Sequence, residues 1–78
     1  MKEYRTCDIG LAAALMTCHW DLQETYNNNG RIGFIFENNH GLKNIIDGYY
    51  SNSLEADLLT YNNNIRALKS RILSAKNE

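Results

Sequence analysis

The last third of the chain carries a heptad repeat that predicts one long amphipathic helix. Its apolar side chains recur at alternating spacings of four and three residues, which places them on a single narrow stripe of a helix. The stripe consists of Leu54, Leu58, Tyr61, Ile65, Leu68, Ile72 and Ala75. At about 1.5 Å per residue, three heptads form a helix of about 33 Å. Because this is longer than a small three-stranded sheet requires, the helix is expected to wrap its own fold, to contact a second copy, or to do both.

The heptad leaves two alternatives open. In the first, the long helix packs only on the sheet of its own chain. In the second, it also forms a homodimer, because β-branched residues at one core position with leucine at the other favour two-stranded coiled coils. The predicted dimer interface consists of Leu58, Tyr61, Ile65, Leu68 and Ile72. Leu59 and Leu73 lie outside the stripe, so the helix is expected to contact two surfaces at once.

Strand patterns precede the heptad. Residues 2–7 and 20–26 alternate apolar and polar side chains and predict two strands, the second with one wet face. Asn29-Gly30 predicts a tight hairpin turn, because both residues tolerate a positive φ angle. Residues 31–37 form the most apolar of the three strands, with Phe34 in the middle of its apolar face, so we expect this strand at the centre of the sheet.

Helix signals separate and follow these strands. Asp8 stands at the N-cap position of an apolar helix that must be largely buried, because it has no polar side. Asn38 or Asn39 is expected to cap a second helix. Asn52, with Glu55 three residues later, resembles a capping box and is expected to start the heptad helix.

The order of elements, strand, helix, strand, strand, helix, helix, predicts a single α+β domain over residues 1–78. A helix between two strands implies a right-handed crossover with those strands parallel, so the third strand fits antiparallel between them in the order 1-3-2. The first two helices are expected to cover one face of the sheet. The other face is expected to be a mixed surface on which a partner or the long helix could lie. Its residues are Arg5, Asp21, Gln23, Thr25, Arg31 and Ile35.

The chemistry-bearing residues predict neither a catalytic nor a metal site. Cys7 with Asp8, and Cys18 with His19, are adjacent pairs, whereas zinc ligands are spaced by about two to four residues. The two cysteines flank the first helix, which would separate them by about 16 Å along its axis. We therefore expect free thiols, as in a reducing compartment, and we expect no enzymatic activity, no cofactor and no metal.

The net charge and the length of the apolar segments limit the cellular locations and the classes of partner that we expect. The formal net charge is −1, which argues against a general affinity for nucleic acid. We expect no signal peptide and no membrane span, because the apolar runs are too short, and we expect the chain in the cytoplasm. Cations nevertheless gather at the end of the long helix, and these are the residues predicted to bind a partner or nucleic acid. They are Arg66, Lys69, Arg71 and Lys76.

Three segments of the chain resemble a known protein family. The segments are Tyr4–Leu15, Arg31–Glu37 and Ile65–Ile72, and the resemblance extends over nearly the whole chain. The family consists of small proteins of unknown function from bacteria, their mobile elements and phages. The resemblance implies an accessory protein of a phage or mobile element, acting in the host-cell cytoplasm, and it assigns no functional residues.

Two classes of function remain open. In the first, the chain is a small homodimeric interaction protein that binds and modulates a larger host or phage protein, for example as an inhibitor of host defence. In the alternative, it is a nucleic-acid-binding regulator that uses the basic C-terminal helix. Salt separates the two classes, because contacts to phosphates weaken steeply with salt whereas an interface with an apolar centre does not.

Overall fold

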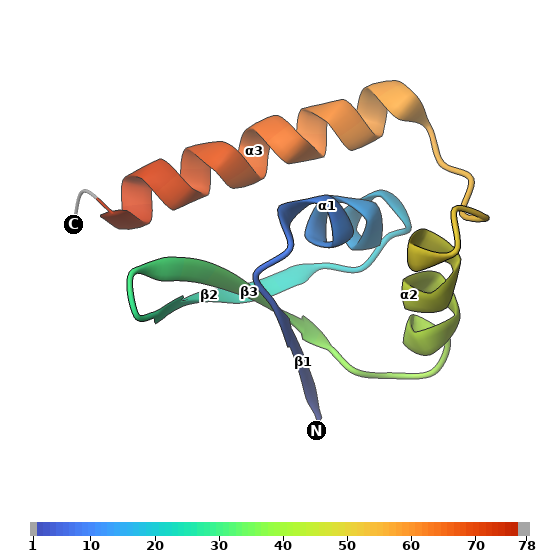
Figure 1. The fold of residues 1–78 in the computed structure, drawn as a ribbon, viewed down its shortest axis with the longest axis horizontal. Coiled ribbons are helices and arrows are strands. Elements are labelled where there is room, and N and C mark those ends of the chain that lie inside the picture. Colours follow the sequence, from blue (N-terminus) through green and yellow to red (C-terminus); the bar gives the residue numbers. More distant parts are fainter. Residues whose placement is uncertain (1, 77–78) are drawn as a thin grey trace.

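The computed structural model describes residues 2–76 and confirms the predicted α+β architecture (Figure 1). The elements are β1 (Glu3–Thr6), α1 (Ile9–Thr17), β2 (Leu22–Asn28), β3 (Arg31–Glu37), α2 (Leu42–Tyr50) and α3 (Leu58–Lys76). The strands form one sheet in the order β1-β3-β2, with β3 antiparallel to both neighbours. β1 and β2 therefore run parallel to each other, as the crossover through α1 requires.

α1 lies at the centre of the molecule. Figure 1 shows it between the sheet and α3, with α2 beside it. Its residues from Leu11 to Leu15 are each at most 2% exposed, which explains why this helix has no polar side. Three of these five residues are alanines, and their small side chains let the sheet and α3 approach α1 closely from opposite sides. Phe34 of β3 is fully buried against this centre.

Two local predictions are confirmed. The Asp8 carboxylate accepts a hydrogen bond from the backbone N–H of Leu11 at 3.2 Å, and Asp8 is the N-cap of α1. Asn29 and Gly30 have φ angles of 55° and 89°, as a two-residue hairpin turn with two positive φ angles requires. The side chain of Asn27 supports this turn by accepting a hydrogen bond from the Gly30 N–H at 2.7 Å.

A β-bulge in β2 changes which residues face the helices. Leu22 pairs with Phe36 on the core side, but Glu24 pairs with Ile35 on the other side, so Gln23 is an extra residue in the ladder. A single extra residue reverses the facing of every residue that follows it. The predicted alternation of β2 is therefore wrong after Gln23.

Thr25 and Tyr26 exchange faces as a result. The prediction that Thr25 lies on the uncovered face of the sheet is wrong, because Thr25 pairs with Phe34 on the core side and lies beside Ala75 of α3. Tyr26 lies on the uncovered face instead. Its ring crosses Gly33 so closely that a Cβ at position 33 would collide with it.

α3 begins at Leu58, one turn later than the heptad predicts. Asp57 provides the start signal in place of the expected pair of Asn52 and Glu55. Its carboxylate accepts hydrogen bonds from the backbone N–H of Thr60 at 2.8 Å and from the Thr60 hydroxyl at 2.6 Å. These two bonds lower the pKa of Asp57, so the cap is charged at neutral pH and favours the N-terminus of the helix.

The two ends of α2 also differ from the expectation. Gly41, with a φ of 95°, is its N-cap in place of Asn38 or Asn39. At the other end Asn52 adopts a φ of 60°, and the N–H of Ser53 donates to the Gly48 carbonyl oxygen at 3.0 Å. A left-handed residue with such a returning bond is the usual way to terminate a helix, so Asn52 ends α2 and does not begin α3.

α3 lies over α1, on the same side of the sheet as α1, and not on the opposite face where the sequence allowed it (Figure 1). Within residues 2–76, the opposite face carries no helix. This face is mixed, as predicted, although Ile35 is only 4% exposed there because Arg5 and Glu24 flank it across the strands.

Candidate interaction surface

The inner side of α3 belongs to the core of its own chain. Leu68 is fully buried, while Tyr61, Ile65 and Ile72 are half-buried and pack against the same core. Leu58, the first residue of the predicted dimer interface, is 82% exposed and stands apart from them. This placement favours the alternative in which the helix packs on its own chain. Self-association through the stripe would require α3 to leave α1, and the molar mass in solution decides between the two alternatives.

Two hydrogen bonds fix the rotation of α3 about its axis. Near the start of α1, the Tyr61 hydroxyl donates to the Gly10 carbonyl oxygen at 3.2 Å. At the end of α1, the Asn64 side-chain amide donates to the Thr17 hydroxyl at 3.0 Å. Because both bonds act together with the buried Leu68, the side of α3 that faces solvent is also fixed.

Tyrosines gather around the first turn of α1. The Tyr50 hydroxyl donates to the second oxygen of the Asp8 carboxylate at 3.0 Å. Burial, followed by the charge of Asp8 and the nearby hydroxyl of Tyr61, raises the pKa of Tyr49 to about 12. Burial also raises the pKa of Tyr4 and of Tyr50. A phenol that stays neutral well above pH 7 is a poor nucleophile or base, so this cluster suits a structural role.

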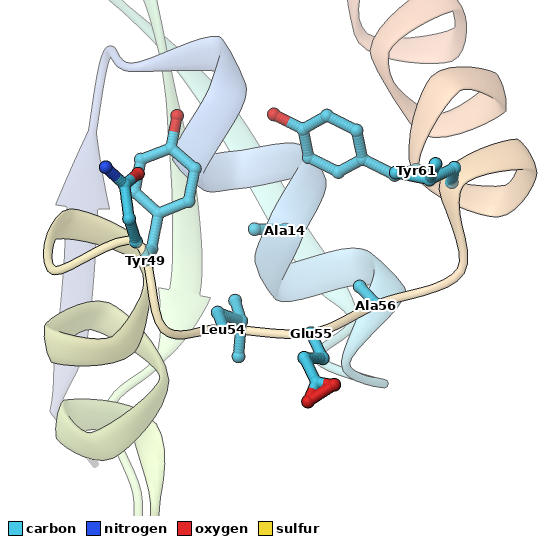
Figure 2. A pocket seen from close by; sticks show the side chains of 8 residues that line it. Ala14, Tyr49, Leu54, Glu55, Ala56 and Tyr61 are labelled. Carbon is cyan, nitrogen blue, oxygen red and sulfur yellow. The ribbon is translucent and has the colours of Figure 1, made fainter.

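A groove of about 530 Å³ opens beside this cluster. Its lining is Ala14, Tyr49, Asn52, Leu54, Glu55, Ala56, Leu58 and Tyr61. Figure 2 shows the hydroxyls of Tyr49 and Tyr61 directed toward the same end of α1, while the Glu55 carboxylate points away from the groove. The Tyr61 hydroxyl is engaged with the Gly10 carbonyl oxygen, and the lining of the groove is mainly apolar.

The solvent side of α3 carries a second set of aligned residues, here called the outer stripe. Helical spacing places them on one side of α3, away from Leu68, and all of them are exposed. The outer stripe consists of Leu59, Asn62, Arg66, Lys69, Leu73 and Lys76. Leu59 and Leu73 are 70% and 64% exposed. Two largely exposed leucines on one side of a helix offer apolar area that an interaction can bury.

The side chains of α3 also carry a net positive charge, unlike those of the rest of the chain. It contains four cations and no acid, whereas the whole chain has eight cations and nine acids, so the rest of the chain has four cations against nine acids. Among the described residues, the ion pairs join Arg5 to Glu3 and Lys43 to Asp47, and neither pair involves α3. The charges of α3 are therefore open to a partner.

The predicted basic residues do not form one group. Arg66, Lys69 and Lys76 belong to the outer stripe, but Arg71 lies on the flank toward the sheet, beside Thr25 of β2. Sequence reasoning left Leu59 and Leu73 out of the predicted site. The signal that could have included them is their spacing, because Leu59, Arg66 and Leu73 are each seven residues apart.

The cysteine and histidine residues are dispersed. Cys7 and Cys18 are free thiols, and the Cys7 sulfur lies 3.7 Å from the Tyr26 hydroxyl. Burial raises the pKa of Cys18 at the end of α1. Across residues 2–76, no group of three or more histidine, cysteine, aspartate and glutamate side chains is placed to hold a metal ion.

The comparisons with known proteins give a family and no function. The family described as Domain of unknown function (DUF5659) matches residues 1–74. No curated protein and no solved structure matches the chain. Within the part of the chain that the structure describes, no helix has both the length and the apolar character that a membrane crossing needs.

Proposed function

The chain belongs to this family of unknown function (DUF5659), and we propose that it is a non-enzymatic protein-binding module. The outer stripe of α3 is its binding surface, and the partner is a larger protein with an acidic, partly apolar surface. The observation that carries the proposal is the presence, on one fixed side of one helix, of exposed leucines together with cations that form no ion pair within residues 2–76.

The leucines favour a protein over other partners. Burying a leucine side chain contributes about 1.5–3 kcal/mol, and this gain is available at Leu59 and Leu73, which are largely exposed. The cations Arg66, Lys69 and Lys76 add charge complementarity, which raises the rate and the specificity of association more than the affinity. The apolar groove next to Leu58 extends the same surface at the start of α3.

The identity of the partner is proposed from the family resemblance. Since the chain resembles small proteins of phages and mobile elements, we propose that the partner is a host or phage protein of the cytoplasm, for example a component of host defence. The chain would then act by covering a surface of that protein, because 78 residues offer enough area for a standard interface of about 800 Å² per partner.

A nucleic-acid-binding regulator is the second candidate, and one specific observation favours it. α3 has four cations and no acid to repel phosphates. The leucines of the outer stripe count against this candidate, because contacts to phosphates come from cations, polar side chains and backbone N–H groups.

Site-specific photo-crosslinking tests the proposal directly. A photoreactive residue replaces Leu59 or Leu73 in the outer stripe, or the exposed Asn44 of α2 as a matched control. Each protein is irradiated in a lysate of the organism that encodes it, with and without nuclease. We expect protein adducts from positions 59 and 73 that survive nuclease and are absent from position 44.

Two results would count against protein binding through the outer stripe. Equal adducts from all three positions would show that the surface is not selective. Adducts that vanish with nuclease, together with binding that falls steeply with salt, would support the nucleic-acid regulator instead.

A further inference from the structure

The seven-residue spacing within the outer stripe describes the partner in more detail. Leu59, Arg66 and Leu73 repeat at the heptad interval on the exposed side of α3, with the cation midway between the two leucines. We infer that the partner contributes a helix with the complementary pattern, apolar, acidic, apolar, at the same interval, and that Arg66 determines which helices bind. This inference rests on the proposed function.

The heptad interval is the reason to expect a helix. Residues seven apart stay on nearly the same side of an α-helix, and two helices that share this period remain in contact over several turns. Leu59 and Leu73 are about 21 Å apart along the axis of α3 at about 1.5 Å per residue. A partner helix lying along α3 therefore meets both leucines only if its own apolar residues are two heptads apart.

The charge at the centre of the stripe is the reason to expect a carboxylate. Arg66 lies between the two leucines, and α3 has no acid to pair with it. A contact that buries both leucines also removes water from Arg66, and an unpaired cation in such a place is costly. An aspartate or glutamate midway in the partner removes this cost, since the arginine side chain can bind a carboxylate through two parallel hydrogen bonds.

The same reasoning disfavours a second copy of α3 as the occupant. In an antiparallel pair, Leu59 meets Leu73 of the other copy and Arg66 meets Arg66. In a parallel pair each residue meets itself, so Arg66 again faces Arg66. Like charges in the middle of the contact disfavour both arrangements. Arg66 thus keeps the leucines available for a partner while it prevents pairing with another copy.

Synthetic helical peptides test the inference with the intact protein. The first peptide has two leucines two heptads apart with glutamate midway, and the second has lysine in place of that glutamate. The third has the composition of the first, but its glutamate lies on the far side of the helix. Binding is measured by fluorescence anisotropy to the wild type, to Arg66→Glu, and to Leu59→Ser with Leu73→Ser. Circular dichroism checks that each variant is folded, which is expected because all three positions are exposed.

We expect the wild type to bind the glutamate peptide about tenfold more tightly than the lysine peptide, and Arg66→Glu to reverse this order. The double serine variant should lose binding to both. Equal binding of the first and third peptides would overturn the inference, because the affinity would then not depend on where the glutamate lies on the peptide helix. Failure of all three peptides to bind would also overturn it. Neither result decides the proposed function, which the photo-crosslinking experiment tests without assuming a helical partner.

Discussion

The Tyr61 hydroxyl donates a hydrogen bond to the Gly10 carbonyl oxygen, 3.2 Å away, and joins the first turn of α3 to the first turn of α1. The contact depends on glycine at position 10, because a Cβ there would collide with the Tyr49 hydroxyl and crowd that of Tyr61. This contact helps to set which side of α3 faces the core and which side carries the outer stripe.

Replacing Tyr61 with phenylalanine tests the contribution of this bond. Tyr61→Phe keeps the ring against the core but removes the hydroxyl that donates to the Gly10 carbonyl oxygen, which then keeps only its bond within α1. We expect the free energy of unfolding to fall by about 1 kcal/mol, measured by urea denaturation. An unchanged stability would show that the hydroxyl does not hold α3 against α1.

The two sides of α3 should respond differently to truncation. Leu68 is fully buried and Leu73 is 64% exposed. We expect Leu68→Ala to lower the free energy of unfolding by about 2–5 kcal/mol, and Leu73→Ala to change it by less than about 0.5 kcal/mol. Both are measured by urea denaturation. Similar losses from the two variants would mean that α3 does not pack in the described orientation.

Much of the fold follows from local signals in the sequence. The N-cap at Asp8, the turn at Asn29-Gly30 and the apolar pattern of β3 each act within a few residues, and together with the handedness of crossovers they predict the strand order. The predicted start of α3 was wrong because the heptad pattern extends back to Leu54, four residues before the helix begins. Which residue becomes the N-cap of α3, Asp57 or an earlier one, depends on how α2 ends. The heptad pattern contains no information about that ending.

The bulge at Gln23 can be tested through the contact that it creates between Tyr26 and Gly33. Gly33→Ala should destabilise the protein by about 1–3 kcal/mol, because the added methyl group overlaps the Tyr26 ring. In a Tyr26→Ala background the same change should cost little. Thermal unfolding of the two single variants and the double variant measures this coupling. Equal costs of Gly33→Ala in both backgrounds would place Tyr26 away from Gly33 and contradict the bulge.

Alkaline pH should weaken the fold through Tyr49. Its pKa is raised to about 12 in the folded protein, against about 10 in an unfolded chain. The folded state therefore holds its proton where the unfolded state has lost it. The stabilisation is complete below about pH 10 and is lost as the pH rises toward about 12.

Thermal unfolding followed across this range checks the effect, with Tyr49→Phe as the comparison. Tyr4, Tyr26 and Tyr50 also have raised pKa values and remain in that variant. The fall in stability with pH should thus be shallower in Tyr49→Phe, but not absent. The same slope in both proteins would show that Tyr49 titrates normally.

The candidate site was harder to predict than the fold. Hydrophobic periodicity identifies the side of a helix that will be buried, and it found Leu68 and its neighbours correctly as one stripe. It does not say whether that stripe meets its own chain or another. Sequence reasoning noted Leu59 and Leu73 outside the heptad but did not join them with the cations into one site, because two leucines separated by polar residues form no continuous apolar pattern. These leucines are exposed because α1 packs on the other side of α3, which the sequence pattern does not specify.

The molar mass in solution tests the central claim most directly. The claim is that the inner side of α3 packs on the core of its own chain and that the charge of Arg66 prevents two copies from pairing through the outer stripe. Light scattering should give the wild type a mass near 9.0 kDa. Arg66→Leu should double the mass, since Leu59, position 66 and Leu73 would then form a continuous apolar heptad. A wild type that is already dimeric, with a mass that Arg66→Leu leaves unchanged, would contradict the account.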